Sequence, residues 1–364
     1  MSEHAFLPEN ETFGEHEMVG TTPQHPAADD QARSARLRET LGFDPDQEGE
    51  KIDPMKEGEE LIDHLNIDEL RNIFSEMRRR SGVPEDSLFV SKEDIQVTST
   101  IGYAGLFSPD GKLSINPEII MEEMINEGVI PTKAELRRRI LSVLAHEETH
   151  ASGRNIDKGN RVLYELLSYV SQKPQLSSAN GYKKFVYVKG KAQPRFAIFS
   201  EGVTDLIGEE AYSTYLDRTG ERASLLGSEE NAAYKGSYMG ARALTTTFIE
   251  VIANAADTPI DVVWQGLKQG YMSGLDLDDN ELAKVIDEEF YPEFMRDVEH
   301  AYIDELELPL PEIVKRLKEK QLSAEAKEKI KRALLKYDDQ LRIQREQSMS
   351  ASRRVDEYHE RFFN

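Results

Sequence analysis

Two histidines with a glutamate between them are the residues of this chain best suited to chemistry. They stand in the string Leu141-Ser-Val-Leu-Ala-His-Glu-Glu-Thr-His150, where His146 and His150 are four residues apart. On a helix this spacing places both imidazoles on one face, where they can hold a single divalent cation. Glu147 then lies beside the ion and can accept a proton from a water whose pKa the ion lowers toward ~7.

A catalytic zinc ion usually has a third protein ligand and keeps one position for water. The other histidines show no ligand-like pattern, so a downstream carboxylate is the better candidate. Glu201 and Asp205 lie four apart at an expected helix start and point the same way. Glu201 can bind the metal while Asp205 accepts the N–H of a ligating imidazole. Glu165 is the rival ligand, but the position four residues after it is Tyr169.

The sequence independently predicts the helix that carries the histidines. Thr132 and Glu135 have capping-box spacing, so a helix should start at Lys133 and stop at Gly153. Its apolar stripe is formed by Leu136, Ile140, Val143 and Leu144. A second helix, capped by Ser200, is expected to carry the two acids.

Short β-rich runs precede the histidine helix, at residues 87–91, 94–99, 101–107 and 112–116. The turn Ser108-Pro-Asp-Gly111 predicts a hairpin between the last two. Gly105 lies inside one of these strands, which indicates a bulge or, as the alternative, a substrate backbone approaching that edge. Before the strands, residues 59–80 predict one or two amphipathic helices with a break near Asn66.

After the histidine helix the sequence predicts one more helix and one hairpin, and then helices alone. A helix at about 158–172 is followed by a hairpin within 185–199 that turns near Lys189. Further helices are expected at 231–254, 260–272, 280–306, 311–320 and 324–347. The fold class is therefore α+β, with a small, mostly antiparallel sheet and a mainly helical C-terminal part.

Composition limits the partners of this chain of 364 residues. Its formal net charge of −23 argues against a nucleic-acid or anionic-membrane partner. The absence of cysteine excludes thiol catalysis and thiolate metal sites. No run of 18 apolar residues and no signal-peptide pattern is visible, so a cytoplasmic location is expected.

Four segments are predicted along the chain. Residues 1–58 are expected to be a disordered acidic tail, and 59–155 an α+β subdomain with the active-site helix. Residues 156–310 would form a mainly helical subdomain with the third ligand, and 311–364 a helical extension.

Residues 87–275 resemble the gluzincin branch of the zinc-dependent metallopeptidases. The similarity rests on His146-Glu147-x-x-His150, on Glu201-x-x-x-Asp205 and on the order of strands, hairpin and helix before them. It implies a zincin-like fold with His146, His150 and Glu201 on Zn²⁺. It also implies that Glu147 is the general base and that Asp205 orients His146. The hairpin at 185–199 would then be an insertion between the two core helices.

The same resemblance implies a tyrosine or histidine that holds the oxyanion of the tetrahedral intermediate. Tyr238 is the first candidate and Tyr234 the second, with Arg242 one helical turn beyond Tyr238.

The expected function is zinc-dependent hydrolysis of peptide bonds in a peptide or protein substrate. Endopeptidase activity is favoured because no Gly-x-Met-Glu-Asn exopeptidase string is present. One alternative is a catalytically silent zincin-like scaffold that binds a protein partner. Another is an all-helical interaction protein with an accidental motif, which the β-rich run at 87–116 would distinguish.

Overall fold

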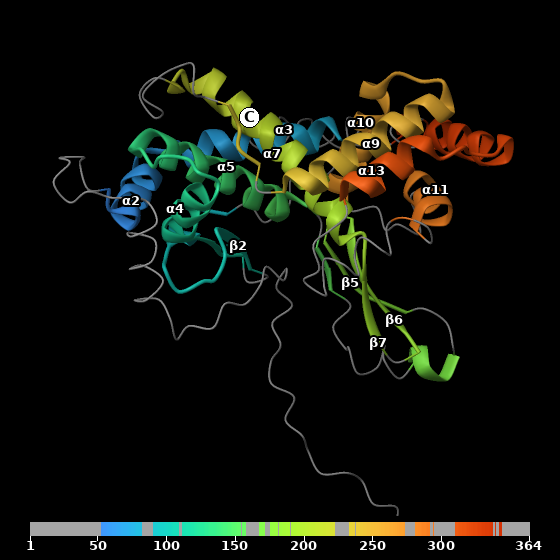
Figure 1. Cartoon of the computed structure of the whole chain (residues 1–364), viewed down its shortest axis with the longest axis horizontal. Coiled ribbons are helices and arrows are strands. Elements are labelled where there is room, and N and C mark those ends of the chain that lie inside the picture. The colour runs from blue at the N-terminus through green and yellow to red at the C-terminus, as the bar shows by residue number, and fades with distance from the viewer. Residues whose placement is uncertain are drawn as a thin grey trace, which may run out of the picture.

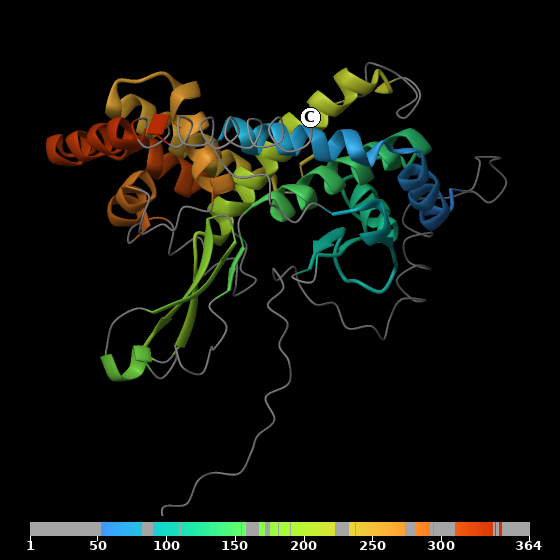
Figure 2. The same cartoon turned by 180° about the vertical axis from the view of Figure 1, so that it is seen from behind.

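The structure is a computed structural model in which helices dominate. It describes residues 52–81, 90–108, 111–153, 155–157, 167–171, 175–180, 182–189, 191–222, 233–236, 238–273, 281–291, 294, 310–337, 339 and 342–343. The helices form an elongated body, and two small sheets lie on the same side of it in both views (Figures 1 and 2). This arrangement is an α+β fold.

The N-terminal half is built around helix α5, Lys133–Ser152. Thr132 caps it by accepting from the backbone N–H of Glu135 at 3.1 Å, as predicted. It packs against α2 (Pro54–His64), α3 (Ile67–Arg80) and α4 (Pro117–Asn126), and almost every residue of its second half is buried. Gly153 ends it in an extended conformation, with φ of −66°, and not in the left-handed form usual for a glycine stop.

Helices α2 and α3 confirm the predicted break, since Asn66 caps α3 between them. Helix α2 begins at Pro54, inside the segment expected to be disordered, because Asp53 caps it and Leu61 and Ile62 bury its apolar face. Residues 1–51 of the predicted tail and residues 87–89 of the first predicted strand lie outside the described residues.

The first sheet packs on α5 and contains β1 (Ile95–Val97), β2 (Gly105–Phe107) and β3 (Leu113–Ile115) in the order β1-β3-β2. The predicted hairpin is confirmed, because β2 pairs with β3 antiparallel. The sheet is mixed and not mostly antiparallel, since β1 pairs with β3 in parallel. Residues 98–104 carry the chain across to the far edge, where the side-chain amide of Asn116 donates to the carbonyl of Ile101 at 2.7 Å.

A second sheet is inserted between α5 and α7, as the predicted hairpin required. It is antiparallel in the order β4 (Asn155–Asp157), β5 (Gln175–Asn180), β6 (Lys183–Val188) and β7 (Lys191–Arg195). The turn falls at Lys189, which has a φ of 50°. Strands β5 to β7 point away from the helical body in both views (Figures 1 and 2). Of the helix expected at 158–172, residues 167–171 are described and are helical.

Helix α7, Ala197–Thr219, starts one turn earlier than predicted. Phe196 is its N-cap, and Ser200 lies inside the first turn, where its N–H donates to the carbonyl of Phe196 at 2.8 Å. The prediction that Ser200 caps the helix was wrong because Ile198 and Phe199 are buried, and packing extends the helix past the local capping signal.

The remaining helices are α9 (Met239–Ala256), α10 (Ile260–Ser273), α11 (Glu281–Phe290), α13 (Leu310–Glu319) and a helix at 324–337. Helix α9 starts at Met239 and not near residue 231, so Tyr234 and Tyr238 lie before it. One cluster of buried apolar residues runs from Leu61 to Leu334. Among the described residues, no helix is long and apolar enough to cross a membrane.

Candidate metal centre

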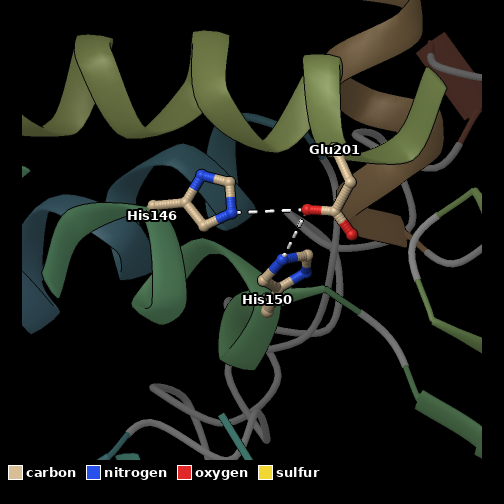
Figure 3. Close-up of side chains that lie close together, drawn as sticks. All are labelled: His146, His150 and Glu201. Carbon is tan, nitrogen blue, oxygen red and sulfur yellow. Dashed lines mark hydrogen bonds and ion pairs between the residues drawn. The ribbon is translucent and has the colours of Figure 1, made fainter. Parts of the chain in front are cut away.

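Helices α5 and α7 pack against each other and bring two histidines and a glutamate together (Figure 3). One carboxylate oxygen of Glu201, Oε2, lies 3.4 Å from Nε2 of His146 and 3.2 Å from Nε2 of His150. One ligand atom from each residue falls within 4.8 Å of the other two. The structure therefore brings together the three predicted ligands. The rival Glu165 lies outside the described residues.

The outer nitrogen of His146 faces the second acid of α7. Nδ1 of His146 lies 3.4 Å from Oδ1 of Asp205, which is fully buried. The hydroxyl of Tyr234 donates to the same oxygen at 2.9 Å. Gly236 passes so close that a Cβ there would overlap Oδ2 of Asp205. The segment before α9 thus covers the carboxylate that faces His146.

The surroundings of His146 and Glu201 favour the charged state of both side chains, although both are buried. Burial lowers the pKa of His146, but the carboxylates of Asp205, Glu201 and Glu147 outweigh it and raise the pKa to about 10. Burial raises the pKa of Glu201, but His150 and His146 outweigh it and hold the pKa well below its usual range. The site therefore stabilises positive charge opposite Glu201.

The donor atoms fit a divalent cation. Both ring nitrogens of His146 are buried, and at these distances neither has a hydrogen-bond partner of good geometry. Unsatisfied buried nitrogens are costly, and a metal ion is one group that would satisfy Nε2. Two imidazole nitrogens and a carboxylate oxygen form the donor set of many catalytic zinc sites.

Glu147 lies on α5 between the two histidines and faces β2. Its Oε2 accepts the backbone N–H of Phe107 at 2.9 Å. A Cβ on Gly105 would come within 2.8 Å of the Cγ of Glu147 and 2.5 Å of Val143. The pairing of β2 with β3 runs in continuous register, so the bulge expected at Gly105 is not formed. Side chains of α5, and not a backbone, occupy the space above this glycine.

The three oxyanion candidates have different surroundings. Tyr238 stacks its ring on His146, with centroids 5.2 Å apart and planes 27° apart. Tyr234 uses its hydroxyl on Asp205. Arg242 lies one turn beyond Tyr238, with its N–H on that residue's carbonyl, and its guanidinium pairs with Glu209. Of these candidates, Tyr238 contacts a predicted ligand directly.

Sequence reasoning missed one tyrosine of the site. The hydroxyl of Tyr271, on α10, lies 3.4 Å from Nδ1 of His150 across a separation of 121 residues. It also lies 2.8 Å from the hydroxyl of Thr204. It stands between Gly270 and Met272, far along the chain from both motifs, so no local signal marked it.

Comparisons with known protein families, with curated proteins and with solved structures find no match to this chain. Its function is therefore inferred from the geometry and chemistry of the site.

Proposed function

We propose that this protein is a zincin-like, gluzincin-type metallopeptidase that hydrolyses peptide bonds, with endopeptidase activity favoured. The observation that carries the proposal is the convergence of His146, His150 and Glu201 on one point between α5 and α7. Glu147 follows His146 on the same helix, which is the position a general base requires. The resemblance of the two motifs to those of gluzincins supports a peptide or protein as substrate.

Each residue of the site has its own role in the proposed reaction. When bound, zinc would polarise the carbonyl of the substrate and lower the pKa of a water. Glu147 accepts the proton of the attacking water and passes it to the leaving amine. Asp205 keeps the His146 ring oriented. Tyr238, whose ring stacks on His146, is the first candidate to stabilise the oxyanion. Arg242 ranks after Tyr238, because it would first have to leave Glu209.

Metal analysis and a cleavage assay on the same proteins test this proposal. The wild type is expected to hold one zinc per chain and to cleave casein or a peptide library. His150→Ala should lose the zinc. Glu147→Gln should keep it and lose cleavage. His64→Ala is the matched control, because His64 is an exposed histidine on α2.

One kind of result would exclude the metal site, and another would exclude the mechanism. Sub-stoichiometric zinc in the wild type, or zinc unchanged in His150→Ala, would exclude the site. Cleavage unaffected by Glu147→Gln in a zinc-loaded protein would exclude the mechanism.

A further inference from the structure

The two histidines of the site have different groups on their outer nitrogens. Nδ1 of His146 faces a carboxylate, Asp205, which can only accept a proton. Nδ1 of His150 faces a hydroxyl, that of Tyr271, which can donate or accept. The direction of that second contact determines which nitrogen of His150 carries the proton when the ring is neutral.

Thr204 fixes this direction. Its hydroxyl lies 2.8 Å from the carbonyl of Ser200, one turn earlier on α7, and a carbonyl can only accept. The single hydroxyl proton of Thr204 is therefore used on Ser200. In the 2.8 Å contact between Thr204 and Tyr271, Tyr271 must then be the donor.

The proton of Tyr271 is in turn used on Thr204. Its oxygen can only accept from His150, so Nδ1 of His150 must carry a proton. Tyr271 is fully buried, and a tyrosine hydroxyl carries its proton at neutral pH, so one proton is available to the Thr204 contact. With the proton on Nδ1, the lone pair of the neutral ring is on Nε2, the nitrogen that faces Glu201.

We propose that Tyr271, with Thr204 behind it, is a positioning residue that holds His150 in the Nδ1–H tautomer and presents its Nε2 lone pair to the metal. This inference rests on the proposed zinc site. Helix α10 would then supply the hydroxyl that faces the outer nitrogen of His150. Groups that orient ligating histidines in this way typically contribute 10- to 100-fold to metal affinity.

Tyr182 provides a matched control beside Tyr271. It is also buried, and its ring lies edge-on to that of Tyr271 with centroids 6.0 Å apart. Its hydroxyl donates to the carbonyl of Leu267 at 2.7 Å, on the same helix, and not to a ligand. Tyr182→Phe therefore removes one buried hydroxyl from the same region without touching His150.

The first measurement is zinc affinity at one fixed pH, by competition with a chelator. Tyr271→Phe is expected to weaken zinc binding about 10- to 100-fold. Thr204→Val should weaken it as well, because Tyr271 is then free to donate its proton toward Nδ1. Tyr182→Phe should bind zinc as the wild type does. Wild-type affinity in a folded Tyr271→Phe would overturn the inference.

The second measurement uses nuclear magnetic resonance of the zinc-loaded wild type labelled with ¹⁵N-histidine. A slowly exchanging Nδ1–H proton is expected for His150, and it should exchange faster in Tyr271→Phe but not in Tyr182→Phe. A wild-type His150 without a proton on Nδ1 overturns the inference and needs no variant. Zinc bound normally by Tyr271→Phe overturns this inference alone, whereas a wild type that binds no zinc overturns the proposed function as well.

Discussion

His146 is contacted on three sides, by two residues of α7 and by one residue that precedes α9. Glu201 faces its Nε2, Asp205 faces its Nδ1, and Tyr238 covers one face of the ring. Tyr234 then donates to Asp205. The orientation of the His146 ring is therefore fixed before any ion binds. This lowers the entropic cost of ordering the ring when it binds the ion.

Removing the hydroxyl of Tyr234 should loosen this arrangement. Tyr234→Phe leaves the buried Asp205 without its donor, at a cost of about 1–3 kcal/mol in the free energy of unfolding. Zinc affinity should fall about 10-fold or more. Urea unfolding and chelator competition measure the two effects.

Tyr212→Phe is the control for Tyr234→Phe. The Tyr212 ring packs on Tyr234 with centroids 5.5 Å apart, but its buried hydroxyl has no hydrogen-bond partner within the described part of the chain. This variant should be neutral or slightly stabilising. Equal effects of the two substitutions would show that Tyr234 acts by packing alone.

Glu148 should make the metal-free protein less stable as the pH rises. Burial raises the pKa of its carboxyl to about 8, against the N–H of Val90 and the charge of Arg71. From its ordinary pKa of about 4.5 up to about 8, the folded protein keeps a proton that the unfolded chain has lost. Stability should therefore fall across this window.

Glu148→Gln removes this contribution, so its unfolding free energy should fall less between pH 5 and pH 8, by on the order of a few kcal/mol. Urea unfolding at the two pH values measures the difference. Glu59→Gln, at an exposed position of α2, should keep the wild-type slope. A slope for Glu148→Gln equal to that of the wild type would mean that Glu148 ionises normally in the folded protein.

At the scale of elements, glycines set how closely the parts of the site approach. Gly105 lets β2 lie on α5, where the N–H of Phe107 reaches Glu147. Gly202 does the same for α7 and α9, because a Cβ there would overlap the side chain of Thr245 and the backbone of Ala241. Larger residues at either position would separate the elements that position the proposed catalytic groups.

Gly105→Ala is expected to destabilise the protein and to impair Glu147, the proposed general base. The new Cβ would press on Val143 and on Glu147, and overpacking of this kind costs about 1–3 kcal/mol. Peptide cleavage should fall while zinc content is kept. Gly102→Ala, where nothing lies within 4 Å of the added Cβ, should leave both stability and cleavage near wild type. Similar losses in the two variants would contradict this account.

At the scale of the whole molecule, the site joins distant segments. Helix α5 carries two of the proposed ligands, α7 carries the third, and α10 carries the hydroxyl on His150. All three helices share one continuous apolar core. An ion bound there would hold together helices from both halves of the chain. Metal binding should therefore stabilise the chain as one unit.

Zinc should raise the unfolding temperature of the wild type. At 100 times its Kd a ligand adds about 2.7 kcal/mol, which is several degrees for a protein of this size. Far-UV circular dichroism and the fluorescence of Trp264, the chain's single tryptophan, should shift together. A chelator should reverse the shift, and His150→Ala should show none. A shift seen by one probe and not by the other would mean that the ion stabilises only part of the molecule.

The sequence by itself determined the local features of this protein. The cap at Thr132, the helix under His146 and His150 and the two hairpins follow from interactions within a few residues. The same holds for the spacing that puts Glu201 and Asp205 on one helix face. These interactions join residues within one or two helical turns, so they can be recognised in the sequence without knowledge of the fold.

Only the tertiary structure decided which groups meet. Burial of Ile198 and Phe199 moved the start of α7, and the crossing at 98–104 made the first sheet mixed. The contacts of Tyr234 with Asp205 and of Tyr271 with His150 span 29 and 121 residues. Contacts over such separations depend on how the whole core packs, and no local pattern encodes them.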